Sequence, residues 1–333
     1  MPFHFETIVK KNTLLSNHST YEIGGEAKYF ASPENLEELV FLIDSCTKKG
    51  LKYYIFGNGA NILFPDNPDK EIIFITLKKF IDLKLSKEGI HVSSGIPLSF
   101  LSIIGYLLQN ESLYFTYLLP GSVGAGIYMN ARCYESEISQ IVSNIYYIDL
   151  EEKSSEVKKI LPLDCCFGYK SSIFQKKKWI ITGVDININY DKEKIFDNNL
   201  LNKIKDKSPS LSNLKEFYSF FKNISESLMK EKFSEKFLKI EEDRNLKRHF
   251  DYPSCGSVFK NNRSFGSPMG IIIERLGLKG KSHGRAMISP YHGNIIINRG
   301  GAKARDIIYL IKTIEETVYK HYSILPEREI IVI

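Results

Sequence analysis

Apolar and polar residues in the first part of the chain follow two different periods. The apolar-rich run at residues 27–32 predicts a strand, and apolar residues then recur at helical spacing from Leu36 to Ile43. Gly50 marks the expected end of that helix, and the run at residues 52–56 predicts a buried strand. The predicted order is therefore a strand–helix–strand crossover.

The rest of the chain mixes both periods. Short β-like runs separated by Lys and Asp turns fill residues 72–92. The pattern further predicts helices at 98–108, 270–276 and 304–322, and strands at 179–188, 293–298 and 325–333. No internal repeat of about 20 to 50 residues is visible, which excludes a repeat architecture.

The segment from Asn189 to Phe250 has a different composition, rich in Lys, Glu, Asn, Ser and Phe. Apolar residues recur in it at helical spacing, namely Leu211, Leu214, Phe217, Phe221 and Leu228. Its positive and negative charges nearly balance, whereas a nucleic-acid-binding arm would carry a run of one sign. We therefore expect a solvated helical connector.

Composition narrows the class of protein. The chain has 333 residues, of which 43% are hydrophobic and 25% charged, as in folded globular proteins. This length fits about two or three domains. The formal net charge of +6 is mild and suits an acidic small molecule, so we expect no nucleic-acid partner.

The sequence also argues against membrane and metal sites. No apolar run approaches the roughly 18 to 20 residues of a membrane span, and the N-terminus lacks a signal-peptide pattern. The five cysteines include no C-x-x-C pair, and the seven histidines form no closely spaced set. We expect a cytoplasmic protein with no metal.

Two Gly-rich segments are candidates for ligand binding. Residues 57–61, Gly-Asn-Gly-Ala-Asn, follow a predicted strand, where backbone N–H groups can converge on an anion. The Rossmann pattern is absent, because Ile62 stands where its third Gly would be. Residues 118–131 carry three glycines and suit a flat or charged ligand. An ordinary turn and a tightly packed corner are the simpler interpretations.

A polar turn lies at residues 253–261, where Ser257, Lys260 and Asn261 come close together in sequence. Turns of this composition are common, so the motif alone is weak evidence. Glu327 lies near the start of the last predicted strand, and a lone Glu at such a position is usually solvated.

Six motifs in order carry a resemblance that no single one would. They are Thr20–Gly25, Gly57–Asn61, Pro120–Gly124, Tyr169–Phe174, Pro253–Asn261 and Leu325–Glu327. Together they resemble the UDP-N-acetylenolpyruvoylglucosamine reductase family, flavoenzymes of peptidoglycan precursor synthesis. The resemblance extends from about Thr20 to Val332 and implies an α+β fold, with a two-part FAD-binding module of the vanillyl-alcohol-oxidase type and a C-terminal α+β substrate domain.

The resemblance suggests domain boundaries. Residues 1–66 would form the first FAD-binding part, to which the strand at 325–333 is expected to return, and residues 67–190 the second. Residues 191–250 would form the helical connector or insertion, and residues 251–324 the substrate-binding domain.

The same resemblance implies the reaction and its catalytic residues. NADPH would reduce FAD, and the enolpyruvyl ether of a UDP-sugar would receive the hydride and become UDP-N-acetylmuramate. Ser257 matches the family's proton donor, Glu327 its glutamate, and Lys170 the position that holds the substrate carboxylate. Such a site needs a cation and a proton donor, because negative charge develops on the substrate.

Other family positions imply binding residues. Those expected at FAD are Tyr21, Ile23, Gly24, Gly57, Asn58, Gly59, Ala60, Asn61, Pro120, Gly121, Ser122, Gly124 and Asn130. Those expected at the substrate are Tyr169, Lys260, Asn261 and Glu274. We expect a monomer or a weak oligomer.

Lys170 departs from the family, which usually has Arg there. Lys keeps the positive charge but cannot make a bidentate pair with a carboxylate. Either Lys170 performs the task with looser geometry, or the site is impaired or helped by another base such as Arg132. Cys255, Arg285 and Met287 are further departures from the usual motifs.

Two alternatives to this function stay open at this point. The chain could be an FAD oxidase of another alcohol or sugar, or a flavin-binding relative that has lost catalysis. One branch of the family closes a Tyr-bearing loop over the substrate, and Tyr190 and Tyr218 are the candidates here.

Overall fold

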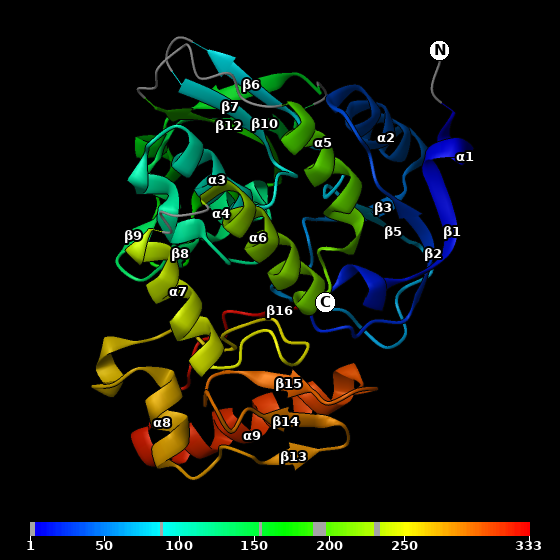
Figure 1. Cartoon of the computed structure of the whole chain (residues 1–333). Coiled ribbons are helices and arrows are strands. Elements are labelled where there is room, and N and C mark those ends of the chain that lie inside the picture. The colour runs from blue at the N-terminus through cyan, green and yellow to red at the C-terminus, as the bar shows by residue number, and fades with distance from the viewer. Residues whose placement is uncertain (1–3, 87–88, 153–154, 189–197, 230–233) are drawn as a thin grey trace.

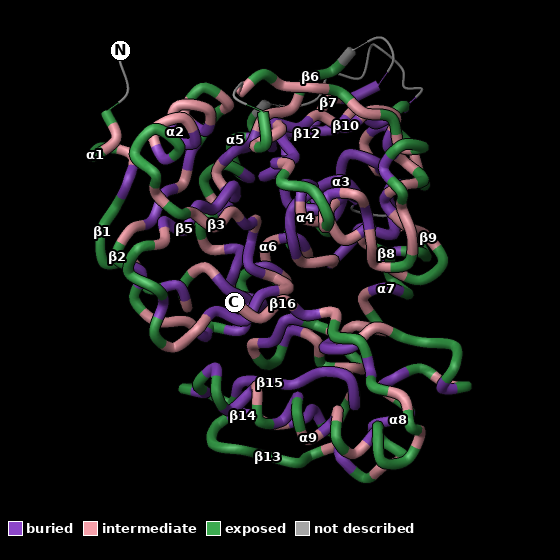
Figure 2. Tube along the Cα trace, turned by 180° about the vertical axis from the view of Figure 1, so that it is seen from behind, coloured by how far each residue is buried: buried purple, intermediate pink, exposed green. Residues whose placement is uncertain are grey.

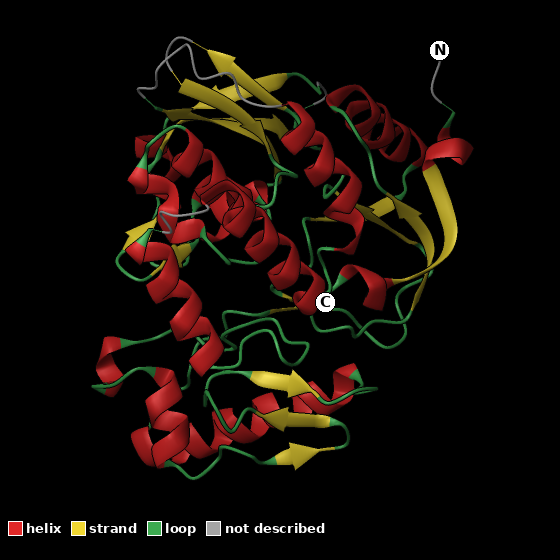
Figure 3. Cartoon of the chain, viewed as in Figure 1, coloured by secondary structure: helices red, strands yellow, loops and turns green. Residues whose placement is uncertain are grey.

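The chain folds into three parts with separate sheets, joined by a group of helices (Figure 1). The computed structural model describes residues 4–86, 89–152, 155–188, 198–229 and 234–333. Tyr190 lies outside these residues. Helices and strands are mixed in all parts, which makes the fold α+β (Figure 3).

The first part is a four-stranded sheet covered by one long helix. Its elements are α1 (Phe5–Ile8), β1 (Val9–Leu14), β2 (Glu26–Ala31), α2 (Leu36–Lys49), β3 (Lys52–Phe56) and β5 (Ile72–Thr76). The strand order is β1-β2-β5-β3, with only β1 and β2 antiparallel. This part therefore reaches past residue 66, because β5 lies inside its sheet and its side chains pack with α2.

Local signals fix the ends of α2. The Asn35 side chain accepts a hydrogen bond from the Glu38 N–H at 2.8 Å and caps the first turn. Gly50 takes the left-handed conformation (φ +63°) that ends the helix. The face with Leu39, Leu42 and Ile43 is buried against the sheet.

The second part is a five-stranded antiparallel sheet with helices on one side. Its strands are β6 (Leu83–Ser86), β7 (Gly89–Ser93), β10 (Val142–Asp149), β11 (Val157–Ile160) and β12 (Trp179–Asn187), in the order β11-β10-β12-β7-β6. The helices are α3 (Leu98–Leu107), the 3₁₀-helix η2 (Glu111–Thr116) and α4 (Val123–Met129), and a small hairpin joins β8 (Arg132–Cys133) to β9 (Ser136–Glu137). Buried chain, purple in Figure 2, gathers between the sheet and these helices.

The segment predicted as a solvated connector is partly buried. It forms α5 (Asn198–Lys207), η6 (Ser208–Ser210), α6 (Leu214–Met229) and α7 (Glu235–Leu246). The fully buried rings of Phe217, Phe221 and Phe237 join the hydrophobic core of the second part. The helical spacing of these residues thus builds a core face, and only the opposite face meets solvent.

The C-terminal part packs α8 (Met269–Arg275) and α9 (Ala304–Tyr322) with a three-stranded sheet. The strands are β13 (Ser282–His283), β14 (Ala286–Ile288) and β15 (Ile296–Asn298), antiparallel in that order. The chain then returns to the first part, where β16 (Ile331–Val332) pairs in parallel with β4 (Ile62–Leu63). The Asp66 carboxylate accepts a hydrogen bond from the Ala304 N–H at 2.9 Å, so the first part caps α9.

Candidate functional site

A cavity of about 650 Å³ lies where the three parts and the helical segment meet. Its wall combines the turn at residues 57–61, the turn at 119–122, Lys170, the turn at 254–257 and Glu329. Segments that are far apart in sequence therefore converge on one space, of a size ordinary for a small-molecule site.

The turn at residues 57–61 is equipped to bind a polar ligand. Among the described residues, none accepts a hydrogen bond from its five backbone N–H groups. Asn58 Oδ1, Ser94 Oγ and Ser122 Oγ are buried at the cavity wall and have no hydrogen-bond partner there within the described structure. Buried polar groups are normally satisfied, so these atoms fit a bound molecule with polar groups of its own, such as the diphosphate and ribityl chain of FAD.

The glycines of the two Gly-rich segments allow close contacts between these segments and with their neighbours. A Cβ at Gly57 would lie 2.2 Å from Ser122 Oγ, and one at Gly124 would lie 2.7 Å from Ser94 Cβ. At Gly59, with φ +65°, a Cβ would meet the His18 carbonyl at 2.1 Å. A larger residue would not fit at these three positions, because the neighbouring atoms are too close. The close packing that glycine permits forms the wall of the cavity.

Most of the residues expected at FAD line this cavity. Those that do are Gly57, Asn58, Gly59, Ala60, Asn61, Pro120, Gly121, Ser122 and Gly124. Tyr21, Ile23, Gly24 and Asn130 are not among the described residues of its wall. Tyr21 and Ile23 lie in the core with the C-terminal part, and Asn130 Nδ2 donates to the Gly168 carbonyl at 3.0 Å.

Ser257 lies on a turn that is anchored to the first part. Gly256 has φ +69°, which suits the turn, and Ser257 pairs with Ile295 as an isolated bridge. Cys255 is buried and donates its Sγ–H to the Ile62 carbonyl at 3.3 Å. Burial raises the pKa of the Cys255 thiol to about 12, so it acts as a neutral anchor. Ser257 itself faces the cavity.

Lys170 and Glu329 form an ion pair at the cavity wall. Lys170 Nζ lies 2.6 Å from Glu329 Oε1, and the two side chains are only 17% and 12% exposed. Lys170 has φ +54°, a backbone conformation uncommon outside glycine, and its carbonyl accepts a hydrogen bond from Gln175 Nε2 at 3.1 Å. The structure therefore brings Ser257, Lys170 and Glu329 to the same cavity.

Glu327 differs from the sequence-based expectation. Its side chain is 72% exposed, pairs with Lys260 Nζ at 2.6 Å and is not among the described residues of the cavity wall. The glutamate in the cavity is Glu329, two residues further on, which the sequence analysis missed. The available signal was its position, because Glu329 comes directly before the apolar run at residues 330–333 that ends the chain.

Of the four residues expected at the substrate, only Asn261 is among the described residues of the wall. Its N–H approaches Tyr169 Oη at 3.4 Å, and its Oδ1 accepts a hydrogen bond from the Met269 N–H. Lys260 is held by Glu327, and Glu274 pairs with Lys279 at 3.1 Å on the surface of α8.

The helical segment brings charges that the sequence analysis did not assign to the site. Arg244 and Lys247 line the cavity together with Arg132, which lies on β8. Arg244 donates to Cys133 Sγ at 3.3 Å and contacts His249 Nδ1 at 3.1 Å. Burial, with a smaller contribution from Arg244, lowers the pKa of His249 to about 2, so this imidazole is neutral. The basic run before Pro253 was the available signal.

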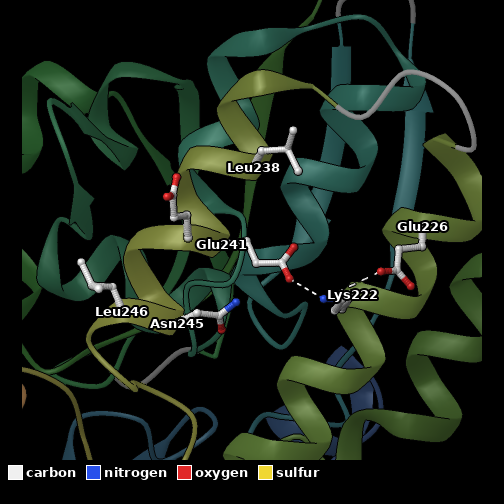
Figure 4. Close-up of a pocket in the computed structure, with 7 residues that line it drawn as sticks. Lys222, Glu226, Leu238, Glu241, Asn245 and Leu246 are labelled. Carbon is white, nitrogen blue, oxygen red and sulfur yellow. Dashed lines mark hydrogen bonds and ion pairs between the residues drawn. The ribbon is translucent and has the colours of Figure 1, made fainter.

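A shallow hollow between α6 and α7 offers no comparable chemistry (Figure 4). Lys222 lies 2.6 Å from Glu241 and 3.8 Å from Glu226. Tyr218 donates to Glu241 at 2.8 Å and stacks on Phe250, so its ring is fixed between the helices. These charges satisfy one another and join the two helices.

Neither a membrane-spanning helix nor a metal-binding group is found among the described residues. None of their helices is long and apolar enough to cross a membrane. Their His, Cys, Asp and Glu side chains form no group of three that could hold a metal ion.

The fold and the cavity define an FAD-binding α+β protein, and residues 27–157 match an FAD binding domain. Residues 248–333 match the C-terminal domain of UDP-N-acetylenolpyruvoylglucosamine reductase. The reductase of that name from Borreliella burgdorferi is 31% identical over 100% of this chain and 99% of its own length. The chain belongs to the UDP-N-acetylenolpyruvoylglucosamine reductase family.

Two further proteins with the same name are similar to this chain. The Carboxydothermus hydrogenoformans reductase is 30% identical, covering 95% of this chain and 91% of the relative. The crystal structure of the Thermus caldophilus reductase has the same fold, with a TM-score of 0.63 and 23% identity over 97% of this chain and 98% of that chain.

Proposed function

We propose that this protein reduces UDP-N-acetylenolpyruvoylglucosamine to UDP-N-acetylmuramate, a step of peptidoglycan precursor synthesis, with NADPH as the electron source. One observation carries the proposal. A cation (Lys170), a carboxyl group (Glu329) and a hydroxyl (Ser257) face the cavity that the turn at residues 57–61 also lines. FAD, when bound, would take a hydride from NADPH and deliver it to the substrate.

Lys170 is the proposed partner of the enolpyruvyl carboxylate. Its side chain is 17% exposed and lines the cavity, so its charge is only weakly screened by water. Glu329 Oε1 lies 2.6 Å from Lys170 Nζ, and a substrate carboxylate would share this ammonium group with Glu329. Lys170 therefore supplies the charge that an Arg would otherwise provide, without the bidentate geometry.

Ser257 is the proposed proton donor. Hydride addition to one carbon of the enolpyruvyl group leaves negative charge on its neighbour, which is a strong enough base to take a proton from a hydroxyl. No described residue makes a hydrogen bond with Ser257 Oγ, so the hydroxyl is available to a ligand in the cavity. The fixed turn at Gly256 orients it.

Glu329, rather than Glu327, is the glutamate we propose at the reacting centre. Its buried carboxyl beside Lys170 can hold or return a proton near the developing charge. Glu327 is exposed and engaged by Lys260, which supports a role at the outer surface only.

Arg132, Arg244 and Lys247 are the proposed contacts of the substrate diphosphate. All three line the cavity, and neutral His249 lies beside Arg244. Three cations that line one cavity suit a diphosphate anion. This would give α7 and the residues that follow it a role in substrate binding.

One experiment separates this function from its alternatives. Purified protein should show a yellow flavin spectrum and should oxidise NADPH rapidly only when the enolpyruvyl UDP-sugar is added. Rapid reoxidation by O₂ with no need for the sugar would favour an oxidase. A flavin that neither NADPH nor the sugar changes would indicate a binding protein without catalysis, the outcome left open by Lys170.

A further inference from the structure

Asn61 contacts the segment that carries Glu329 at two points. Its side-chain Nδ2 donates to the Glu329 carbonyl at 2.9 Å, and its own carbonyl accepts a hydrogen bond from the Ile331 N–H at 3.0 Å. The parallel pairing of β4 with β16 continues directly from this contact. Asn61 is the last residue of the Gly-rich turn, and its contacts join that turn to the C-terminal segment.

This contact is well placed to control the Glu329 carboxyl. The Glu329 N–H donates to the Val258 carbonyl at 2.8 Å, so Val258 holds one side of its backbone and Asn61 the other. Before Ile331 the segment forms no regular strand and pairs only through the isolated bridge of Arg328 with Phe259. Without the Asn61 amide, the Glu329 carbonyl would lose the partner that fixes it against the cavity wall.

The same turn also supports Ser257. Cys255, two residues before Ser257, contacts the Gly59 carbonyl at 3.7 Å and the Ile62 carbonyl at 3.3 Å. Both proposed proton-transfer groups are therefore fastened to residues 59–62, next to the N–H groups proposed to hold FAD. Small displacements matter here, since about 1 Å at a reacting centre costs on the order of 100-fold in rate.

We propose that Asn61 is a positioning residue, whose side-chain amide fixes Glu329 relative to the flavin instead of binding the flavin itself. The inference rests on the proposed function, because it assigns Asn61 to the half of the reaction in which the sugar is reduced. Reduction of bound FAD by NADPH needs no proton from Glu329 and should not depend on this amide.

The test separates the two halves of the reaction in the FAD-loaded Asn61→Ala protein. We expect FAD content and flavin bleaching by NADPH to stay within about 2-fold of wild type. Reoxidation of the reduced flavin by the UDP-sugar should slow about 10- to 100-fold, mostly in the maximal rate and little in the sugar concentration for half-maximal rate. Asn110→Ala is the matched control, since it removes an amide that caps η2, on a different part of the surface.

A second variant covers the case in which alanine impairs folding. Asn61→Asp keeps the shape of the side chain, but its carboxylate cannot donate to the Glu329 carbonyl, so we expect the same slow reoxidation. Wild-type reoxidation in both variants would overturn the proposal. Loss of FAD on gel filtration would also overturn it, because Asn61 would then bind the cofactor directly. If wild type itself fails to respond to the sugar while NADPH bleaches it, the proposed function fails, and this role with it.

Discussion

Glu327 and Glu329 have the same side chain and are two residues apart, but they meet different surroundings. Glu327 is 72% exposed beside Lys260, whereas Glu329 is 12% exposed beside Lys170. In a regular strand, residues two apart share a face. Here only Ile331 and Val332 form a strand, so the contacts of Glu329 with Asn61 and Val258 decide its direction.

The first prediction compares these two carboxyl groups. Glu329→Gln should lower the turnover number about 100-fold or more, because it removes the carboxyl group that we propose to exchange a proton at the reacting centre. Glu327→Gln should change it little, since an exposed ion pair contributes little. Steady-state NADPH oxidation with the UDP-sugar measures both. A larger loss from Glu327→Gln would return the catalytic role to that residue.

Lys170 provides the second prediction. Lys170→Met should lower turnover by orders of magnitude, because it removes the proposed carboxylate partner and leaves Glu329 buried without its cation. Bound FAD should remain, which the absorbance spectrum would show. Lys170→Arg is the matched variant and should retain most activity. Unchanged turnover in Lys170→Met would exclude Lys170 from the site.

Ser257 provides the third prediction, which concerns one half of the reaction. In Ser257→Ala, NADPH should still bleach the flavin, but the sugar should reoxidise it about 100-fold or more slowly, because the proposed proton donor is absent. Stopped-flow absorbance follows both steps. Normal reoxidation would show that another group supplies the proton.

Part of this candidate site could be predicted from the sequence alone, and the reason is physical. The Gly-rich turn and the Ser257 turn are set by local backbone requirements, such as φ +69° at Gly256, and local requirements leave a readable pattern. Glu329 and Arg244 reach the cavity through contacts between distant segments. The apolar run after Glu329 and the basic run before Pro253 are visible in the sequence, but neither pattern indicates which distant segment it will contact. The same holds for Tyr21, whose apolar surroundings come from the C-terminal part.

At the scale of elements, predictions were most accurate where the single apolar face of a helix packs against a single neighbouring element. The helix predicted at 304–322 coincides with α9, and α2 ends at the predicted Gly50. The helical segment before residue 250 was harder, because its charges balance and its phenylalanines gave no sign of which core they would enter. The balanced charges predict the solvent-exposed face of α6 and α7 and carry no information about their buried face.

The fourth prediction concerns the cap of α9. Asp66 accepts hydrogen bonds from the N–H groups of Ala304 at 2.9 Å and Arg305 at 3.4 Å, so a carboxylate from the first part caps a helix of the C-terminal part. Asp66→Ala should lower the free energy of unfolding by about 1 kcal/mol. Denaturant unfolding measures it, with Asp69→Ala, a nearby turn residue, as the control. Equal midpoints for wild type and Asp66→Ala would show that the cap contributes nothing.

At the scale of the whole molecule, one buried cation joins the helical segment to the FAD-binding parts. Lys78 is 2% exposed, and its Nζ donates to the Pro209 carbonyl at 3.0 Å and contacts Ser212 Oγ at 3.5 Å. Ser212 Oγ in turn donates to the Asn58 carbonyl at 3.3 Å. No carboxylate among the described residues forms an ion pair with Lys78, so its charge is costly to bury.

The fifth prediction follows from that cost. Burial lowers the pKa of Lys78 from 10.5 to about 8 in the folded protein. Between these pH values the unfolded chain holds more protons on this residue, so the contribution of Lys78 to the free energy of unfolding should rise with pH, by on the order of 1 to 3 kcal/mol. Lys78→Met should remove this rise, whereas Lys79→Met, next to it but exposed and paired with Glu34, should keep it. Urea unfolding from pH 7.5 to 9.5 tests the difference between wild type and variant. The buried thiols of Cys46, Cys165 and Cys255, whose raised pKa values act in the opposite direction, contribute equally to each curve. Parallel curves for wild type and Lys78→Met would mean that the Lys78 ammonium is not held unpaired between the helical segment and the FAD-binding parts.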